Sequence, residues 1–307
     1  MKRRILITTS SFGQFNDGAL EKLKGNDLEV IPNPYERKLT EIELSSLLKK
    51  EKPAGLIAGT EPITEKVLKD SAKYLRVVSR VGSGWDNVDH ECARALGVKV
   101  YRTPDATTET VAELTLGLII NLLRKITQMD HELKAGSWEK RMGSLLQYKK
   151  IGVIGFGRIG RRLAALMAPF DVETGYHDII EIDAGTLGKL MSLESLLAWS
   201  DIVTLHVSAS PNNSVLLDEK RINLMRKGAW LINVSRGGMV DEDALYVALS
   251  SGHLSGAALD VFESEPYDGP LRYLNNVILT PHVGSYACEA RVQMEMEAVD
   301  NLIKGLG

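Results

Sequence analysis

The sequence is poor in cysteine and has no surplus of positive charge. Only Cys92 and Cys288 occur among its 307 residues, which is too few for a disulfide framework and lacks the paired spacing of a zinc motif. We therefore expect no metal site, and two reduced thiols in a cytoplasmic protein. A formal net charge of -3 without a basic patch argues against binding to DNA or RNA.

Long hydrophobic runs are also missing. The basic start Lys2-Arg3-Arg4 is followed only by Ile5-Leu6-Ile7 before polar residues, which is too short for the apolar region of a signal peptide. The richest apolar stretch, Leu114 to Leu123, contains Thr115 and Asn121 and falls short of the roughly 20 residues of a membrane span. The sequence thus predicts neither a membrane nor a nucleic-acid partner.

The composition and the length indicate a globular protein with two domains. Hydrophobic residues make up 44% of the sequence and charged residues 25%, close to the globular average. At 307 residues the chain exceeds the usual single domain. Two domains of roughly 100 to 200 residues are therefore expected.

Short apolar runs bounded by turn residues alternate with amphipathic stretches along the whole chain. This is the pattern of parallel strands joined by crossover helices, so the predicted fold class is α/β with two open parallel sheets. The first hundred residues predict strands at Ile5–Thr8, Leu28–Ile31, Gly55–Ala58, Val77–Val81 and Val98–Tyr101. A second series predicts strands at 150–154, 172–176, 202–207, 230–234, 257–261 and 277–279.

Two longer helices flank the second series. Glu109 to Lys125 is predicted to be helical because its apolar residues recur at helical spacing, and the polar stretch from Gln128 to Tyr148 is predicted to be a connection. The last segment, Glu289 to Lys304, is also predicted to be helical. Because it is too short to stand alone, we expect it to pack back onto the first sheet.

A glycine-rich turn follows the first strand of the second series. Gly155-Phe156-Gly157-Arg158-Ile159-Gly160 leads directly into a helical pattern, the context in which G-x-G-x-x-G binds a dinucleotide. The glycines let the backbone approach the pyrophosphate, and the helix N-terminus offers free N–H groups and a positive dipole end. The alternative, a glycine turn without a ligand, is disfavoured by the strand-turn-helix-strand order.

An acidic residue ends the next strand. Asp178 lies roughly 20 positions beyond Gly160, the offset at which a carboxylate binds the ribose hydroxyls of a dinucleotide. No arginine or lysine follows it closely, whereas Glu181 and Asp183 add negative charge that would repel a 2′-phosphate. The sequence therefore predicts NAD in preference to NADP.

Polar residues follow three successive strands of the second series. Arg236 follows the fourth of these strands and His282 follows the sixth. Glu263 and Glu265 follow the fifth. Since ligands bind at the carboxyl ends of parallel strands, we expect these side chains to converge at one edge of the sheet.

These residue types suit hydride transfer between a cofactor and a 2-hydroxy acid. The planar guanidinium of Arg236 can hold a carboxylate and polarise the neighbouring carbonyl. His282 can give a proton to the alkoxide formed in reduction and take it back in oxidation. A glutamate beside the ring would orient it and stabilise imidazolium, and the residues alone leave Glu263 and Glu265 both open.

Several segments together resemble the D-isomer-specific 2-hydroxyacid dehydrogenases, in particular the phosphoglycerate dehydrogenase-like members. They are the glycine-rich turn, Leu231-Ile232-Asn233-Val234-Ser235-Arg236-Gly237, Leu259-Asp260-Val261-Phe262-Glu263-Ser264-Glu265-Pro266 and Thr280-Pro281-His282-Val283-Gly284. The resemblance covers nearly the whole chain. It implies NAD as cofactor and Arg236, Glu265 and His282 as the catalytic set, which selects Glu265 over Glu263.

The resemblance also implies further binding residues. Val81-Gly82-Ser83-Gly84 is similar to the loop whose main-chain N–H groups bind the substrate carboxylate, with Arg236 as the second substrate-binding group. Arg102 stands where the family commonly has asparagine. The cofactor positions implied outside the glycine-rich turn are Thr110, Asp178, His206, Val234 and Asp260.

The architecture implied by the resemblance has one domain inserted in the other. A Rossmann-type NAD-binding domain, 103–282, interrupts a flavodoxin-like substrate domain made of 1–102 and 283–307. The helix from Glu109 onward is similar to part of the family's dimer region, so we expect a homodimer.

The resemblance leaves the substrate open. Candidates are 3-phosphoglycerate, glycerate with hydroxypyruvate, and glyoxylate. Enzymes that act on phosphoglycerate commonly carry arginine in the loop matching Ala58-Gly59-Thr60-Glu61, although Arg80 or Arg102 can substitute as a phosphate-binding cation. We expect no regulatory domain in these 307 residues. The alternatives are an NAD(H)-sensing, corepressor-like protein of the same fold and a formate- or phosphite-type dehydrogenase.

Overall fold

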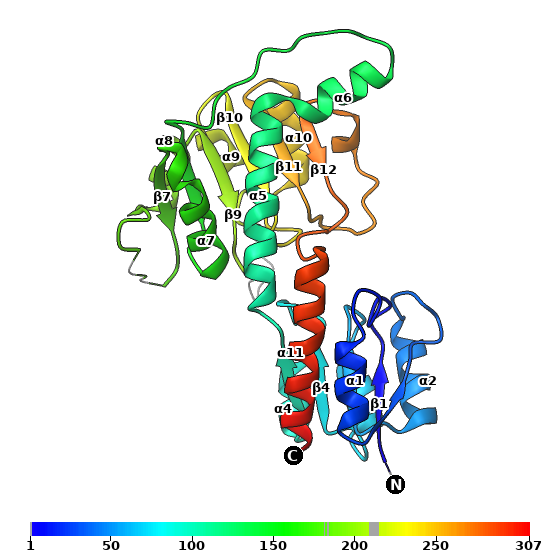
Figure 1. Cartoon of the computed structure of the whole chain (residues 1–307). Coiled ribbons are helices and arrows are strands. Elements are labelled where there is room, and N and C mark those ends of the chain that lie inside the picture. Colours follow the sequence, from blue (N-terminus) through cyan, green and yellow to red (C-terminus); the bar gives the residue numbers. More distant parts are fainter. Residues whose placement is uncertain (1, 181, 183, 209–214) are drawn as a thin grey trace. The chain divides into compact units, whose positions relative to one another are not determined.

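The computed structural model describes residues 2–180, 182, 184–208 and 215–307, and it divides the chain into two compact units (Figure 1). Unit 1 is formed by Met1–Thr107 with Ser285–Gly307, and unit 2 by Thr108–Gly284. These boundaries lie a few residues beyond the predicted ones. Ala106 is buried in a core of unit 1, and Gly284 is bound by Asp260 of unit 2, which places both crossing points further along the chain.

Unit 1 contains a five-stranded parallel sheet in the order β2-β1-β3-β4-β5. The strands are β1 (Arg3–Ile7), β2 (Leu28–Ile31), β3 (Gly55–Ala58), β4 (Val77–Arg80) and β5 (Lys99–Arg102). The helices are α1 (Gly18–Gly25), α2 (Glu41–Glu51), α3 (Glu65–Ser71), α4 (His90–Ala95) and α11 (Cys288–Leu306). This strand order is the flavodoxin-like one, which confirms the predicted fold of this part.

Alternate residues of the unit 1 strands enter two separate cores, because successive side chains of a strand point to opposite faces. Ile5 packs with α1 and α11, whereas Leu6 packs with α2, α3 and α4. The hydroxyl of Ser79 donates a hydrogen bond of 2.8 Å to the carbonyl of Ala298 in α11. The predicted packing of the C-terminal helix on the first sheet is confirmed.

Unit 2 contains a seven-stranded parallel sheet in the order β12-β11-β10-β9-β6-β7-β8. The strands are β6 (Lys150–Ile154), β7 (Glu173–His177), β8 (Lys189–Leu190), β9 (Ile202–Leu205), β10 (Ala229–Asn233), β11 (Leu254–Leu259) and β12 (Val277–Leu279). The helices are α5 (Ala106–Arg124), α6 (Ile126–Lys134), α7 (Arg158–Met167), α8 (Leu193–Trp199), α9 (Glu219–Leu224) and α10 (Glu242–Ser250), with 3-10 turns η1 (Ala168–Phe170) and η2 (Pro270–Tyr273). The order reverses at β6, as in Rossmann folds, which confirms the predicted fold.

Helices cover both faces of the unit 2 sheet. α5 and α7 pack on one face, and α8, α9 and α10 pack on the other. By length and hydropathy alone, α5 is the one described helix that can cross a membrane. However, 56% of its most apolar window is buried inside the protein, as in the core helix of a globular domain.

The strands that precede the predicted catalytic residues are neighbours in this sheet. Asn233 at the end of β10 is in register with Leu259 at the end of β11, which is in register with Leu279 at the end of β12. The loops that carry Arg236, Glu265 and His282 therefore begin side by side at one edge of the sheet.

Candidate active site

The glycine-rich turn of unit 2 connects β6 to α7 and fits a dinucleotide. Gly155 has a φ of +88°, and a Cβ there would lie 2.6 Å from the carbonyl oxygen of His206. A Cβ at Gly160 would lie 2.3 Å from the carbonyl oxygen of Gly155. Both positions thus need glycine, whereas Gly157 caps α7 in open space. The first turn of α7 offers N–H groups that can bind a pyrophosphate.

The carboxylate of Asp178 lies directly beside this turn. One of its oxygens accepts a hydrogen bond from the N–H of Phe156 at 2.6 Å, and the other accepts one from the N–H of Ile180 at 3.1 Å. A negative charge held here can bind ribose hydroxyls and disfavours a 2′-phosphate. Glu181 and Asp183, the two further acids of the prediction, lie outside the described residues.

The other predicted cofactor residues are spread over unit 2. Val234 is buried directly after β10, and His206 directly follows β9, so both lie at the carboxyl edge of the sheet. Thr110 is half-buried near the start of α5. Asp260 follows β11 and is buried, but its carboxylate is bound to the loop after β12.

His206 has a buried ring nitrogen. Its Nε2 atom pairs with the hydroxyl of Thr204 at 3.0 Å, while its Nδ1 atom is enclosed without a hydrogen-bond partner among the described residues. Burial lowers the pKa of His206 to about 3, because a charged ring would lose its hydration there. The ring is therefore neutral near pH 7, and the carbonyl of the same residue lies beside Gly155 of the glycine-rich turn.

The lowered pKa of His206 predicts a loss of stability in mild acid. The unfolded chain takes up a proton near pH 6.5, but the folded chain does so only near pH 3, so the free energy of unfolding falls as the pH drops between these values. At pH 5 the loss is on the order of 1–2 kcal/mol relative to pH 7. Urea unfolding at both pH values will show a smaller difference for His206→Asn than for the wild type. Equal differences would assign the acid sensitivity to other groups.

Glu265 and His282 are brought together from neighbouring loops. The Nδ1 atom of His282 lies 2.9 Å from one carboxylate oxygen of Glu265 and 3.2 Å from the other. The His282 side chain is 52% exposed, so a ligand can reach it from solvent. Glu263 makes a different contact, since its N–H donates to the carboxylate of Glu242 at 2.8 Å. The geometry therefore agrees with the choice of Glu265.

The backbone at His282 is held in an uncommon conformation. Its φ is +55°, a left-handed value that residues other than glycine rarely adopt. One oxygen of the buried Asp260 carboxylate accepts from the hydroxyl of Thr280 at 2.6 Å and from the N–H of Val283 at 2.8 Å. The other oxygen accepts from the N–H of Gly284 at 2.8 Å. Asp260 thus fixes the loop that carries the histidine, a contact that the sequence did not predict.

Arg236 follows β10 in a loop that Asn233 fixes. The side-chain amide of Asn233 donates to the carbonyl of Arg236 at 3.0 Å and accepts from the N–H of Ser235 at 3.1 Å. One guanidinium nitrogen of Arg236 donates to the carbonyl of Ser235 at 2.8 Å. A Cβ at Gly237 would lie 1.7 Å from the carbonyl oxygen of Phe262, so this loop packs its backbone against the loop that follows β11. The three predicted catalytic residues therefore lie on contacting or adjacent loops.

The predicted carboxylate-binding loop follows β4 in unit 1. Val81 donates its N–H to a carbonyl of β3 at 2.9 Å, and Gly82 donates to the hydroxyl of Thr103 at 2.7 Å. The N–H groups of Ser83 and Gly84 have no acceptor among the described residues. Ser83 and Gly84 therefore remain as the loop residues that can donate an N–H to a substrate carboxylate, because the N–H groups of Val81 and Gly82 are already bonded within unit 1.

Glu61, in the loop after β3, is buried although it is acidic. Its carboxylate accepts hydrogen bonds from the hydroxyl of Thr8 and, at 3.1 Å, from the N–H of Gly59. The amide of Asn87 donates to the Glu61 carbonyl at 2.7 Å. The loop in which phosphoglycerate-specific enzymes commonly carry arginine therefore holds a carboxylate here, and that carboxylate is bonded to neighbouring residues of unit 1. Across both units, the described residues include no group of three or more metal-binding side chains.

Comparison with known proteins places this arrangement in a family. Residues 116–284, more than half of the chain, match the family described as D-isomer specific 2-hydroxyacid dehydrogenase, NAD binding domain. The chain belongs to the D-isomer-specific 2-hydroxyacid dehydrogenases. This dehydrogenase is 36% identical to the glyoxylate reductase of Aeropyrum pernix, over 99% of this chain and 93% of that protein.

Two further relatives of this dehydrogenase show the extent of the similarity. It is 39% identical to the D-3-phosphoglycerate dehydrogenase of Sus scrofa, over 94% of this chain but only 54% of that protein. It superposes on the TT0316 protein of Thermus thermophilus with a TM-score of 0.90 and 34% identity, covering 99% of this chain and 96% of the other.

Membership of the family confirms the reaction class and the cofactor expected from the sequence. This dehydrogenase is an NAD-dependent oxidoreductase that interconverts a D-2-hydroxy acid and its 2-keto acid. The individual roles of Arg236, Glu265 and His282 stay predictions, which the contacts in unit 2 support.

Proposed function

We propose that this dehydrogenase reduces a small 2-keto acid with a single negative charge, such as glyoxylate or hydroxypyruvate, and that His282 is its proton donor. The observation that carries the proposal is the pair of His282 and Glu265, joined at 2.9 Å beside the loop of Arg236. A carboxylate next to an imidazole stabilises the protonated ring and fixes its orientation. A proton donor to a carbonyl oxygen needs both.

Each catalytic side chain then has one task. NADH supplies the hydride when it is bound. His282, as imidazolium, gives a proton from Nε2 to the substrate oxygen as negative charge develops there, and the neutral ring takes the proton back in oxidation. Glu265 holds the proton on Nδ1, so that Nε2 is the atom that exchanges it.

Arg236 is the proposed substrate-binding cation. Its guanidinium is half-buried, and the bond to the carbonyl of Ser235 restrains it at the carboxyl edge of the sheet. A planar guanidinium matches a carboxylate with two parallel hydrogen bonds and polarises a carbonyl beside it. We therefore expect that loss of the Arg236 guanidinium would raise KM, because the substrate carboxylate is held less tightly, and lower kcat, because the carbonyl is less polarised.

The proposal of a singly charged substrate rests on Glu61. A phosphate group needs cations, whereas the loop after β3 offers a buried carboxylate. This carboxylate favours glyoxylate or hydroxypyruvate over the phosphorylated keto acid.

Steady-state oxidation of NADH with glyoxylate, hydroxypyruvate, pyruvate and phosphohydroxypyruvate tests this choice. We expect kcat/KM for glyoxylate or hydroxypyruvate to exceed that for phosphohydroxypyruvate by about tenfold or more, the effect of one missing charged contact. A preference for the phosphorylated acid would contradict the proposed substrate. Turnover of formate or phosphite alone would reassign the reaction, and no turnover at all would favour an NAD(H)-sensing, corepressor-like protein.

We also propose that the protein is a homodimer that assembles through α6 and the segment that follows it. No residue of α6 is buried, although a helix of nine residues is marginal without packing. Trp138 and Met142, in the following segment, are 79% and 89% exposed. Large apolar side chains gathered in one stretch of surface are typical of a protein interface.

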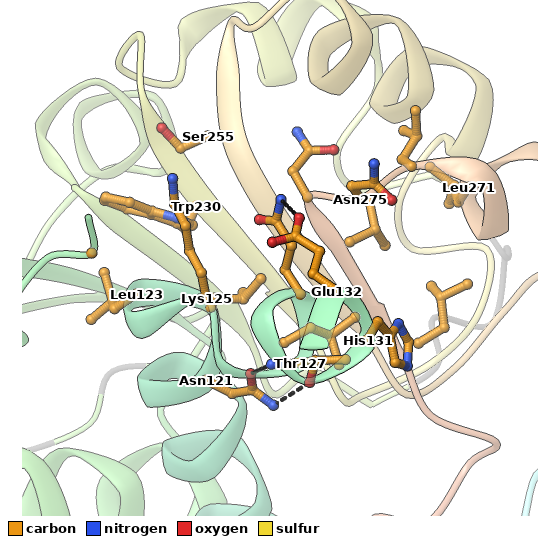
Figure 2. A pocket seen from close by; sticks show the side chains of 18 of the residues that line it. Asn121, Leu123, Lys125, Thr127, His131, Glu132, Trp230, Ser255, Leu271 and Asn275 are labelled. Carbon is orange, nitrogen blue, oxygen red and sulfur yellow. Dashed lines mark hydrogen bonds between the residues drawn. The ribbon is translucent and has the colours of Figure 1, made fainter. Parts of the chain in front are cut away.

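A hollow in the same region is suited to receive such side chains. Figure 2 shows this pocket of about 720 Å³, with Thr127 and His131 on the side of α6 and with Trp230 and Ser255 on the sheet. Asn121 binds the hydroxyl and the N–H of Thr127 at 2.7 and 2.9 Å, which fixes the turn between α5 and α6. A two-fold interface pairs the same surface on both copies, so a surface with both protruding side chains and a hollow favours a second copy as the occupant.

The double substitution of Trp138→Glu and Met142→Glu will separate the dimer. Four glutamates in one symmetric interface would have to lose their hydration, which costs more than the lost apolar contacts contribute. Light scattering after gel filtration will give about 33.8 kDa for the variant and twice that for the wild type. Val247→Glu, at an exposed apolar position of α10, is the matched control and will keep the dimer mass. A wild-type mass equal to one chain would refute the proposal.

We retain the cytoplasmic location, without a membrane or nucleic-acid partner, as a proposal. Cys92 and Cys288 are both free thiols, as suits a reducing compartment. The apolar length of α5 is accounted for by its burial in unit 2. Cell fractionation with an activity assay tests the location, and activity in the membrane fraction would contradict it.

A further inference from the structure

Two arginines end neighbouring strands in unit 1, and both contact the predicted carboxylate-binding loop, residues 81–84. Arg80 of β4 and Arg102 of β5 are in register, so their side chains emerge on the same face of the sheet. Like charges opposite each other are destabilising unless each finds an acceptor. Arg80 donates to the carbonyl of Val81 at 2.6 Å, and Arg102 donates to the carbonyl of Ser83 at 3.1 Å. Both therefore bind carbonyl groups of the loop itself.

Arg102 also covers an aromatic ring of the same loop. Its guanidinium carbon lies 4.3 Å from the centre of the Trp85 ring, a cation–π contact. The ring of His90 lies against Trp85 at 4.3 Å, and the Nε2 atom of His90 pairs with the carbonyl of Trp85 at 3.1 Å. A planar guanidinium can lie over a ring and donate a hydrogen bond from its edge at once, whereas lysine has no flat surface and asparagine has no charge.

The direction of the Ser83 carbonyl fixes the direction of the next N–H group. In a trans peptide the C=O and the following N–H point in opposite directions. The preceding arginine shows this arrangement, because the Val81 carbonyl accepts from Arg80 while the Gly82 N–H donates to the hydroxyl of Thr103. By the same geometry, binding of the Ser83 carbonyl by Arg102 turns the next N–H away from the arginine.

We propose that Arg102 is a positioning residue, which holds the carbonyl of Ser83 and so aims the N–H of Gly84 at the carboxylate of the substrate. The inference rests on the proposed function and on the predicted role of residues 81–84 in binding the carboxylate of the keto acid. The N–H of Gly84 has no acceptor among the described residues, so an anion can take it. Arg102 acts through the loop and does not touch the reacting atoms.

Kinetics of Arg102→Asn test the consequence for the substrate. We expect KM for glyoxylate to rise about tenfold, the effect of one misaligned hydrogen bond to a charged group, with kcat within about twofold of the wild type. Arg102→Lys will lie in between, since it keeps the charge but loses the flat contact with Trp85. Arg76→Asn is the matched control and will leave KM unchanged, because Arg76 is exposed and its guanidinium binds only the carbonyls of Ala72 and Lys73 among the described residues.

Hydrogen exchange of the free protein tests the structural step without any substrate. The amides of Gly82 and Val88, which donate to the hydroxyl of Thr103 and the carbonyl of Trp85 on either side of the clamped segment, will exchange faster in Arg102→Asn than in the wild type and in Arg76→Asn, because the loop has lost its clamp. Equal exchange rates would overturn the proposal. So would a rise in KM that is confined to phosphohydroxypyruvate and absent for glyoxylate, because Arg102 would then bind the second anionic group of a substrate directly. If the wild type reduces no keto acid, the proposed function fails, while the exchange rates still decide whether Arg102 holds the loop.

Discussion

Glutamine in place of His282 will lower the rate of keto-acid reduction by about 10²–10⁴-fold, the contribution of a positioned proton donor. Glutamine can donate a hydrogen bond from its amide, but it cannot release a proton to an alkoxide. The glycine-rich turn and Asp178 make no described contact with the His282 side chain, so NADH will bind with unchanged affinity. Steady-state turnover and a fluorescence titration with NADH measure the two effects separately.

His253 provides a matched control for this substitution. It is a half-buried histidine of unit 2 whose Nε2 atom pairs with the carbonyl of Ile222. His253→Gln will keep turnover within a few-fold of the wild type. Glu265→Gln will fall between the two, because it can still orient the ring of His282 but no longer stabilises its charge. Turnover of His282→Gln within a few-fold of the wild type would remove this histidine from the mechanism.

Alanine in place of Asp260 will impair both stability and turnover. The substitution leaves the hydroxyl of Thr280 and the N–H groups of Val283 and Gly284 without their acceptor in a buried place. Three lost bonds to a charged group correspond to about 3 kcal/mol or more of unfolding free energy. The loop can then relax from the left-handed backbone of His282, and we expect kcat to fall by about 10²-fold or more because proton transfer depends on alignment.

A comparison with Asp201→Ala separates the two effects of this change. Asp201 accepts from the N–H of Lys150 at 2.9 Å and pairs with Arg226 at 2.7 Å, at the opposite end of the strands from Asp260. Its loss will lower the free energy of unfolding in urea but leave kcat per folded molecule unchanged. If Asp260→Ala also retains full kcat per folded molecule, Asp260 does not position the histidine.

The fold could be predicted from the sequence wherever strands are buried on both faces. Such strands are short apolar runs between turn residues, and β3 and β6, whose residues are nearly all buried, begin and end where those runs do. One strand and one α-helix of unit 2 were not predicted. β8 has only two residues, both exposed, which is too short for any pattern. α6 lies in a polar stretch and buries none of its residues, so hydropathy indicated a connection.

The site could be predicted as a set of positions but not as a set of contacts. Parallel strands must bring their carboxyl ends to one edge, so the approach of Glu265 to His282 follows from the order of the elements. The contacts of Asp260 with the His282 loop depend on side-chain direction, which spacing along the chain does not define. The same holds for Gly82, whose N–H is taken by the hydroxyl of Thr103.

The close contact between Gly237 and the carbonyl of Phe262 has a consequence for anyone who redesigns this enzyme. No side chain fits between the two backbones, since a Cβ would lie 1.7 Å from that carbonyl oxygen. The loop of Arg236 after β10 and the loop of Glu265 after β11 should therefore be exchanged together when this enzyme is recombined with a homologue. A chimera that receives only one of these loops will misplace Arg236 relative to Glu265. A chimera that receives both will keep the distance between the two residues.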